Sequence, residues 1–131
     1  MRNLVIILLI LILPVIAYIT LDSKKHQEVI SLAEAGNKPT VMIFTSTMCS
    51  DCMKMKKVIA EVEPNYKDKI EFMKIDAGSN DPQIQSLVKK HNVYLVPTMV
   101  FVDKAGKQKH RTEGSMTKAE FEKKLKDIIN G

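Results

Sequence analysis

Two cysteines, Cys49 and Cys52, are the only thiols in this chain of 131 residues, and two residues separate them. A Cys-x-x-Cys pair can be a structural disulfide, part of a metal site or a redox couple. A disulfide across so short a loop constrains little of the unfolded chain and would contribute only about 2 kcal/mol of stability. A zinc site would need two more ligands, yet the three histidines, His26, His91 and His110, stand far apart without ligand spacing. The pair therefore favours redox chemistry.

Three methionines, Met48, Met53 and Met55, lie beside the pair. Thioethers and thiolates are soft donors that suit Cu(I), so a copper-delivery protein is the alternative function. Residues two apart on a helix point about 200 degrees away from each other, so Met53 and Met55 cannot share a face. A thioether on an apolar stripe, as at Met55, usually packs in a core or a substrate groove. A third hypothesis is a docking domain whose thiols are incidental.

The residues on either side of the pair predict a strand followed by a helix. Residues 40–45 form a short apolar run rich in β-formers, which predicts a buried strand. From Cys52 to Pro64, where the helix is expected to stop, apolar residues recur at helical spacing, at Met55, Ile59 and Val62. Such a helix places Cys49 at its N-terminus, where free N–H groups and the helix dipole stabilise a thiolate.

The rest of the folded chain continues this alternation. The expected elements are an amphipathic helix over residues 23–35, a strand over 69–75, a helix capped by Asp81 with Pro82 in its first turn, a hairpin of strands 98–102 and 107–111, and a last helix opened by a Thr117–Glu120 capping box. From residue 40 onward the predicted order is β-α-β-α-β-β-α.

The N-terminal residues 4–21, LVIILLILILPVIAYITL, carry no charge. As a helix they would reach roughly 27 Å, enough to cross the hydrocarbon core of a bilayer. A cleaved signal peptide is the alternative, because Arg2 supplies a positive start, but no small-x-small cleavage site follows the run. We expect an uncleaved signal-anchor over residues 1–21 and one domain over 22–131. Arg2 and the N-terminal amine lie before the segment, and Lys24 and Lys25 lie after it, so the positive charges on its two sides are almost equal and do not set its orientation. We place the domain on the extracytoplasmic side because this is the commoner arrangement for a short N-terminal tail.

The charge of the chain gives no sign of nucleic-acid binding. The formal net charge is +5, its lysines are scattered without a block of like charge, and the aromatic residues are three Tyr and four Phe with no Trp. Nucleic-acid binding would call for a concentrated basic face with stacking rings.

Several motifs together resemble the thioredoxin family over about residues 25–131. They are the strand-Cys-x-x-Cys-helix unit, Val96-Pro97-Thr98, the hairpin around residues 103–106 and the Glu113-Gly114 step before the last helix. The resemblance implies a thioredoxin fold, with a central mixed sheet flanked by helices. It also implies a cis peptide at Val96-Pro97 packed against the cysteines, and a substrate peptide that pairs with the Val96 backbone. Cys49 becomes the exposed nucleophile and Cys52 the buried resolving thiol.

The sequence departs from the family pattern around the pair. Met48 replaces a Trp, Ser50 and Asp51 replace Gly-Pro, and Ile43 and Phe72 replace a buried Asp and Lys. Losing both buried charges together leaves an apolar core that needs no compensation. It also leaves Cys52 without an obvious proton acceptor, and we hypothesise that Asp51 or water takes this proton.

The carboxylate of Asp51 disfavours a Cys49 thiolate and so favours a reductant or an isomerase, whereas Lys54 and the helix dipole act in the opposite direction. We expect a membrane-tethered thiol-disulfide oxidoreductase that acts as a reductant on protein disulfides, with no bound cofactor and no metal. Val96, Pro97 and Met48 are expected to contact the substrate, and Ser50 and Asp51 to modulate the pair. A membrane thiol-transfer partner would re-reduce the pair.

Overall fold

The computed structural model describes residue 3, residues 6–18 and residues 37–131. The chain divides into two units, Met1–Glu34 and Ala35–Gly131, and residues 6–18 of the first are helical. The amphipathic helix expected over residues 23–35 lies outside the described residues. Across residues 3, 6–18 and 37–131, no helix combines the length and the apolar character needed to cross a membrane. The signal-anchor therefore stays a prediction.

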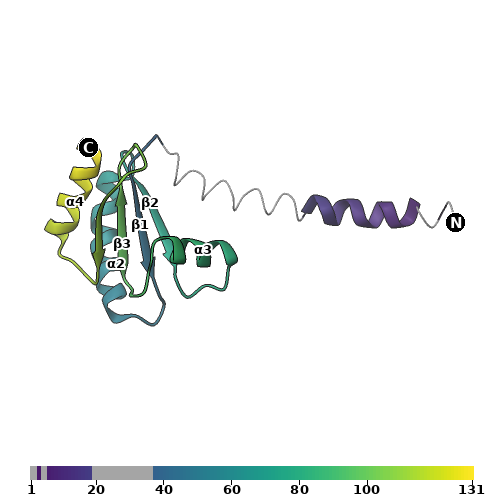
Figure 1. Cartoon of the computed structure of the whole chain (residues 1–131), viewed down its shortest axis with the longest axis horizontal. Helices are drawn as coiled ribbons and strands as arrows, with labels where there is room; N and C mark the ends of the chain where they lie inside the picture. The colour runs from purple at the N-terminus through teal and green to yellow at the C-terminus, as the bar shows by residue number, and fades with distance from the viewer. Residues whose placement is uncertain (1–2, 4–5, 19–36) are drawn as a thin grey trace. The chain divides into compact units, whose positions relative to one another are not determined.

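A four-stranded sheet forms the centre of the second unit (Figure 1). Its strands, in the order β2-β1-β3-β4, are β2 (Glu71–Asp76), β1 (Thr40–Thr45), β3 (Thr98–Val102) and β4 (Gln108–Glu113). β1 runs parallel to β2 and antiparallel to β3, and β3 is antiparallel to β4. β1 and β3 are buried almost throughout, as expected of central strands. The mixed sheet and the order of elements from residue 40 onward confirm the prediction.

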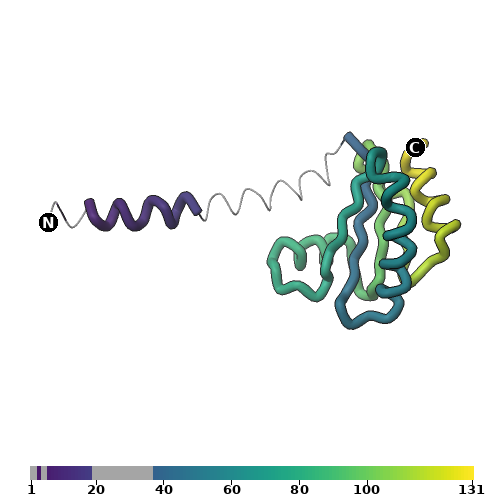
Figure 2. Tube along the Cα trace, turned by 180° about the vertical axis from the view of Figure 1, so that it is seen from behind, coloured from purple at the N-terminus to yellow at the C-terminus, as the bar shows by residue number. Residues whose placement is uncertain are grey.

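Two of the three helices described in the second unit cover one face of the sheet, as the tube in Figure 2 shows. They are α2 (Ser50–Tyr66) and α4 (Lys118–Asn130), whereas α3 (Pro82–Lys90) lies to the side. The core between the sheet and these two helices consists mainly of buried apolar residues, which are Val41, Ile43, Met55, Ile59, Val62, Ile70, Met99, Phe101, Phe121, Leu125 and Ile128. Packing in this core fixes the position of α2 relative to β1.

The prediction that Pro64 stops the first of these helices is wrong, because α2 continues through Pro64 to Tyr66. Pro64 is exposed and lies in the last turn, where its missing N–H removes only one bond near the helix end. Val62 is fully buried and Tyr66 packs against the core, so burial of these two side chains favours the extra turn. Lys67 N–H still donates to Glu63 O at 2.9 Å.

The predicted helix starts and turn are confirmed in detail. Asp81 Oδ1 accepts the N–H of Gln83 at 2.8 Å, with Pro82 in the first turn of α3. Thr117 and Glu120 form the reciprocal capping box of α4. The strand bounds differ slightly: β2 begins at Glu71, two residues later than predicted, and β4 runs two residues further, to Glu113.

The turn between β3 and β4 depends on a buried carboxylate. Gly106 adopts φ 79°, a left-handed conformation that favours glycine. Asp103, only 5% exposed, accepts backbone N–H bonds from Lys107 at 3.0 Å and Ala105 at 2.9 Å, with Lys109 3.6 Å away. The Lys107 bond is the main cause that lowers the pKa of Asp103, with the Ala105 bond and Lys109 adding to it. The hairpin is thus held by an ionised side chain.

Candidate active site

Cys49 and Cys52 are joined by a disulfide at the N-terminus of α2. Cys49 is the N-cap residue, and its Sγ accepts the backbone N–H of Cys52 at 3.1 Å. Cys52 is fully buried, whereas Cys49 is partly exposed. After reduction, Cys49 Sγ would lie against a free helix N–H and the positive end of the helix dipole, the environment that stabilises a thiolate.

The peptide bond between Val96 and Pro97 is cis, as the family resemblance implied. Val96 O lies 3.4 Å from Cys49 Sγ, so the reduced thiol of Cys49 can donate to this carbonyl. Gly114, the residue after β4, supports the same segment, since its N–H donates to Pro97 O at 2.8 Å and its φ of 87° favours glycine. Two segments nearly fifty residues apart in sequence thus meet at the pair.

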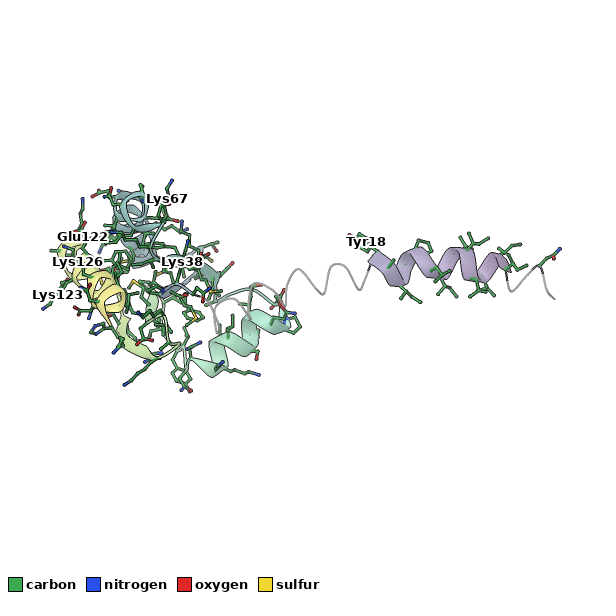
Figure 3. All side chains as sticks on the ribbon, turned by 90° about the horizontal axis from the view of Figure 1, so that it is seen from above. Tyr18, Lys38, Lys67, Glu122, Lys123 and Lys126 are labelled. Atoms are coloured by element: carbon green, nitrogen blue, oxygen red, sulfur yellow. A yellow bond between two sulfur atoms is a disulfide. The ribbon has the colours of Figure 1, made fainter. Side chains whose placement is uncertain are left out.

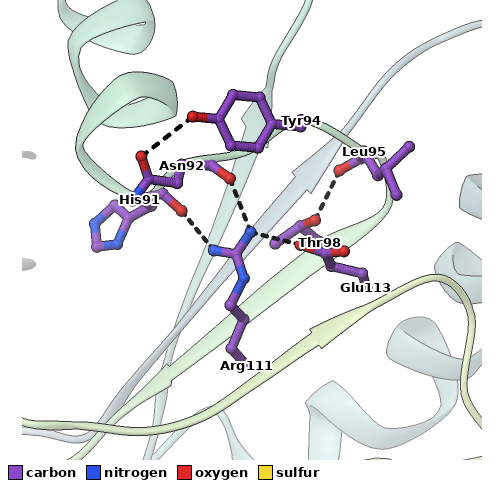
Figure 4. A network of polar contacts seen from close by, with 7 residues as sticks. All are labelled: His91, Asn92, Tyr94, Leu95, Thr98, Arg111 and Glu113. Carbon is purple, nitrogen blue, oxygen red and sulfur yellow. Dashed lines mark hydrogen bonds and ion pairs between the residues drawn. The ribbon is translucent and has the colours of Figure 1, made fainter.

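A single arginine holds the connection between α3 and β3 that carries Val96 (Figure 4). The guanidinium of Arg111, on β4, donates to His91 O, to Asn92 O at 2.9 Å and to Glu113 Oε1 at 2.8 Å. Further along the connection, Thr98 Oγ1 donates to Leu95 O at 2.7 Å. We call the bonds of Arg111 to the two carbonyls the arginine clamp. Sequence reasoning missed it, because an arginine in an edge strand usually points into solvent.

The ring of His91 belongs to the same region. It lies 5.9 Å from the Phe44 ring on β1, between ring centroids. Burial lowers the pKa of His91, and the nearby cations Lys90 and Arg111 lower it further. His91 is therefore neutral at pH 7 and packs as an uncharged ring.

Ile43 and Phe72, the two positions where the family pattern has a buried Asp and Lys, have apolar surroundings in the structure. Ile43 is 1% exposed and belongs to the core. Phe72 packs against that core, with its ring 6.5 Å from that of Phe121. These contacts agree with the expectation that the two lost charges leave a packed apolar layer. The route by which Cys52 loses its proton must therefore lie elsewhere.

The acidic residue between the cysteines is at the surface and is paired. Asp51 Oδ1 lies 3.0 Å from Lys54 Nζ, and the two side chains are 50% and 72% exposed. Ser50 is exposed as well. Both side chains are exposed, so solvent screens the effects of the Asp51 and Lys54 charges on Cys49.

The methionines around the pair have different surroundings. Met55 is fully buried in the core, whereas Met48 is 96% exposed and Met53 55% exposed. A copper site would therefore lose Met55 as a donor. Within the described ranges, no three side chains of His, Cys, Asp or Glu gather in a way that could hold a metal ion.

Two further apolar side chains lie in the segment before Val96, and sequence reasoning did not single them out. Tyr94 is 83% exposed and Leu95 is 61% exposed. With Met48, they are exposed side chains on the two segments that meet where Cys49 Sγ lies near Val96 O. Exposed apolar groups at a reactive site commonly contact a protein partner. Their position in the sequence, three and two residues before Pro97, was the signal that could have identified them.

The sheet order, the disulfide at the start of a helix and the cis proline beside it define a thioredoxin-like thiol-disulfide oxidoreductase domain. Comparison with known protein families matches residues 26–129 to the family described as "Thioredoxin-like domain". The chain therefore belongs to the thioredoxin-like family.

Relatives and solved structures agree with this assignment. The chain is 32% identical over 85 residues to thioredoxin Y of Oryza sativa subsp. japonica, covering 65% of this chain but only 48% of the rice protein. It is 28% identical over 127 residues to the thiol-disulfide oxidoreductase ResA of Bacillus thuringiensis subsp. konkukian, covering 82% and 71% of the two chains. The crystal structure of oxidised thioredoxin O2 from Arabidopsis thaliana superimposes with a TM-score of 0.67 and 25% identity, over 81% of this chain and 88% of the other.

Proposed function

We propose that the protein is a thiol-disulfide reductase that its N-terminal segment tethers to a membrane, with the disulfide domain on the extracytoplasmic side. The observation that carries the catalytic part of this proposal is the unequal exposure of the two sulfurs. Cys49 is partly exposed at the N-cap of α2, and Cys52 is buried one turn further on. An exposed sulfur can meet a substrate disulfide, whereas the buried one can meet only its partner.

In the proposed reaction, the thiolate of Cys49 attacks one sulfur of a protein disulfide, and the other substrate sulfur leaves as a thiolate. A mixed disulfide then joins Cys49 to the substrate. Cys52 loses its proton and attacks Cys49 Sγ, which releases the second substrate thiolate and forms the Cys49–Cys52 disulfide. Two electrons pass from the pair to the substrate, which leaves as a dithiol.

The surroundings of the pair favour an extended apolar segment as substrate. The Val96 backbone lies beside Cys49 and is proposed to pair with the substrate chain. Met48 and Leu95 are exposed on the two segments that meet at the disulfide, so they can contact apolar side chains that flank the substrate cysteine. An unfolded or loosely folded protein with a disulfide at its surface would offer such a segment.

The acceptor of the Cys52 proton is proposed to be Asp51 or a water molecule. Asp51 lies between the two cysteines in sequence, is half exposed and bonds to Lys54 at 3.0 Å. The test is the rate at which a preformed mixed disulfide at Cys49 resolves in Asp51→Asn. A substantially slower rate supports Asp51, and an unchanged rate removes it from the mechanism and leaves water.

The direction of electron transfer is tested by the reduction potential of the pair. We propose a reductase because the Asp51 carboxylate disfavours the Cys49 thiolate, and a stabilised thiolate is what makes strong oxidants strong. A potential near that of thioredoxin, about −270 mV, is expected. A value near that of DsbA, about −120 mV, would refute the reductase proposal.

The tether is proposed from the uncharged residues 4–21. Supporting it, the described helix over residues 6–18 exposes a continuous set of leucines and isoleucines to its surroundings, with Ile10 65% exposed. Such a surface is unstable in water and favourable in lipid. A reductase outside the cytoplasm would need a thiol-transferring membrane partner to recharge it. Resistance of the full chain to alkaline extraction, with the domain digested by external protease, is the expected result.

Trapping separates redox function from the alternatives. In Cys52→Ser the mixed disulfide at Cys49 cannot resolve, so substrates should remain covalently bound and be released by dithiothreitol. Cys49→Ser is the matched control and should trap none. A protein that only binds copper would trap no substrate and would take up Cu(I) when reduced. The burial of Met55 argues against that alternative.

A further inference from the structure

Six exposed lysines from four separate stretches of the chain come together at one end of the disulfide domain. Strand pairing explains this, because Thr40 at the start of β1 lies opposite Glu71 at the start of β2 and Val102 at the end of β3. We name the six residues the lysine end, and they are Lys38, Lys67, Lys69, Lys104, Lys107 and Lys126. Figure 3 views the domain from this end, with Lys38, Lys67 and Lys126 labelled and the helices α2 and α4 seen end-on.

No carboxylate within the described residues forms an ion pair with any of these six lysines. Four of the cations that do have such partners lie elsewhere: Lys54 pairs with Asp51, Lys74 with Glu63, Lys118 with Glu61 and Arg111 with Glu113. Near this end, Lys109 contacts Asp103 and His110 contacts Asp127. The lysine end therefore carries charge that the fold leaves available.

The carboxylates at this end only partly offset that charge. Asp103 is buried and lies against Lys109, and Asp127 contacts His110 at 3.1 Å. Asp68, Glu71 and Glu122 are left to balance the six lysines. A net positive surface results, although the lysines are scattered in sequence.

A recess lies within the lysine end, between the last turns of α2 and α4. Its volume is about 390 Å³, and Lys69 and Lys126 line it together with Tyr66, Ile129 and Glu122. The two lysines outnumber the one carboxylate of Glu122, and together with an aromatic and an aliphatic side chain they suit a group that is anionic on one side and apolar on the other. A phospholipid headgroup with its glycerol backbone has this chemistry.

The lysine end is also where the chain enters the domain, since Lys38 comes just before β1, whereas the disulfide follows β1 at the far end. We propose that the lysine end rests on the anionic headgroups of a phospholipid bilayer. This proposal rests on the membrane tether of the proposed function. It adds which face of the domain lies against the lipid. The length of β1, six residues, then holds the disulfide about 20 Å from that surface.

The test uses the full chain in vesicles and a single fluorescent reporter. The chain contains no tryptophan, so Ala105→Trp in the β3–β4 turn introduces a unique reporter at the lysine end. Tyr94→Trp introduces a matched one near the disulfide. With quencher-labelled lipids, the Ala105→Trp emission should be quenched in vesicles containing phosphatidylglycerol, and high salt should relieve this quenching. Phosphatidylcholine vesicles should quench it less. Equal quenching in both vesicle types, or at both reporter positions, would overturn the proposal.

Removing lysine charges at chosen positions tests whether association with anionic lipid depends on the lysine end or only on the net charge of the protein. Each lysine near an anionic surface contributes roughly fivefold to association, so three Lys→Gln changes should weaken it on the order of 100-fold. One variant changes Lys38, Lys104 and Lys107, a second changes Lys67, Lys69 and Lys126, and the control changes Lys56, Lys57 and Lys89, which lie outside this end. Loss of quenching in the first two but not in the control is expected. An equal loss in the control refutes the proposal, and the second variant serves if the first fails to fold.

Flotation of the full chain with vesicles in high salt tests the tether separately from the lysine end. If the full chain no longer floats with vesicles in high salt, the tether is refuted. Salt-sensitive quenching at Ala105→Trp would still report a peripheral contact by the lysine end. If the chain floats but the reporter stays unquenched with phosphatidylglycerol, the tether stands and the lysine-end proposal fails.

Discussion

Replacement of Arg111 by methionine tests how much of the stability of the domain depends on the arginine clamp. Methionine fills similar space without donors, so the carbonyls of His91 and Asn92 lose their bonds to the guanidinium. Bonds to a charged donor contribute about 1.5 to 3 kcal/mol each when buried. The Arg111 side chain is 26% exposed, so the lower value applies and the two bonds together give about 3 kcal/mol. The ion pair with Glu113 adds less than about 1 kcal/mol.

Urea unfolding of the oxidised domain within the full chain measures this loss. At an m value of about 1.5 kcal/mol per M, a loss of 3 kcal/mol lowers the midpoint by about 2 M. Arg111→Lys should lose about half as much, because one ammonium cannot span both carbonyls. Glu113→Gln is the control and should shift the midpoint little, since it leaves both clamp bonds in place. A shift in Arg111→Met no larger than that of Glu113→Gln would refute the reasoning.

Three further predictions concern stability and its dependence on pH. Phe121 is fully buried against the rings of Phe72 and Phe101, so Phe121→Ala should cost about 3 to 5 kcal/mol in urea unfolding, and a loss below 1 kcal/mol would contradict this. The lowered pKa of Asp103 means that its contribution is complete at neutral pH and declines as the pH falls below about 4, so the deficit of Asp103→Asn should shrink in acid. The lowered pKa of His91 means that the unfolded state binds its proton first, so stability should fall as the pH drops below about 6.5, and His91→Gln should lack this decline in the same titration.

The sequence predicted the elements whose signals are local. The apolar run that became β1, the Asp81 cap and the Thr117–Glu120 box each act within a few residues, so their residue types determine the structure directly. The cis peptide at Val96-Pro97 was implied by the family resemblance and is present. The catalytic roles of Cys49 and Cys52 stay predictions, and the structure shows their disulfide at the start of α2.

What the sequence could not show depends on contacts between distant segments. Nothing near Arg111 in sequence indicates that its guanidinium reaches carbonyls about twenty residues earlier. The lysines appeared scattered, and only strand pairing brings Lys38 close to Lys69 and Lys104 in space. The error at Pro64 has the same origin. A rule for isolated helices was overridden by the burial of side chains on either side of it.

In the arginine clamp, Arg111 donates to main-chain oxygens and not to side chains. This determines which positions of the connection tolerate substitution. Every residue type presents a carbonyl, so the bonds of Arg111 survive those substitutions at positions 91 and 92 that tolerate the left-handed conformation of Asn92, φ 49°. The neighbouring Tyr94 and Leu95 are exposed and outside the core. Mutation can therefore alter the side chains exposed just before Val96 while the course of the backbone is preserved. The exposed side chains and the backbone geometry can thus evolve independently at this connection.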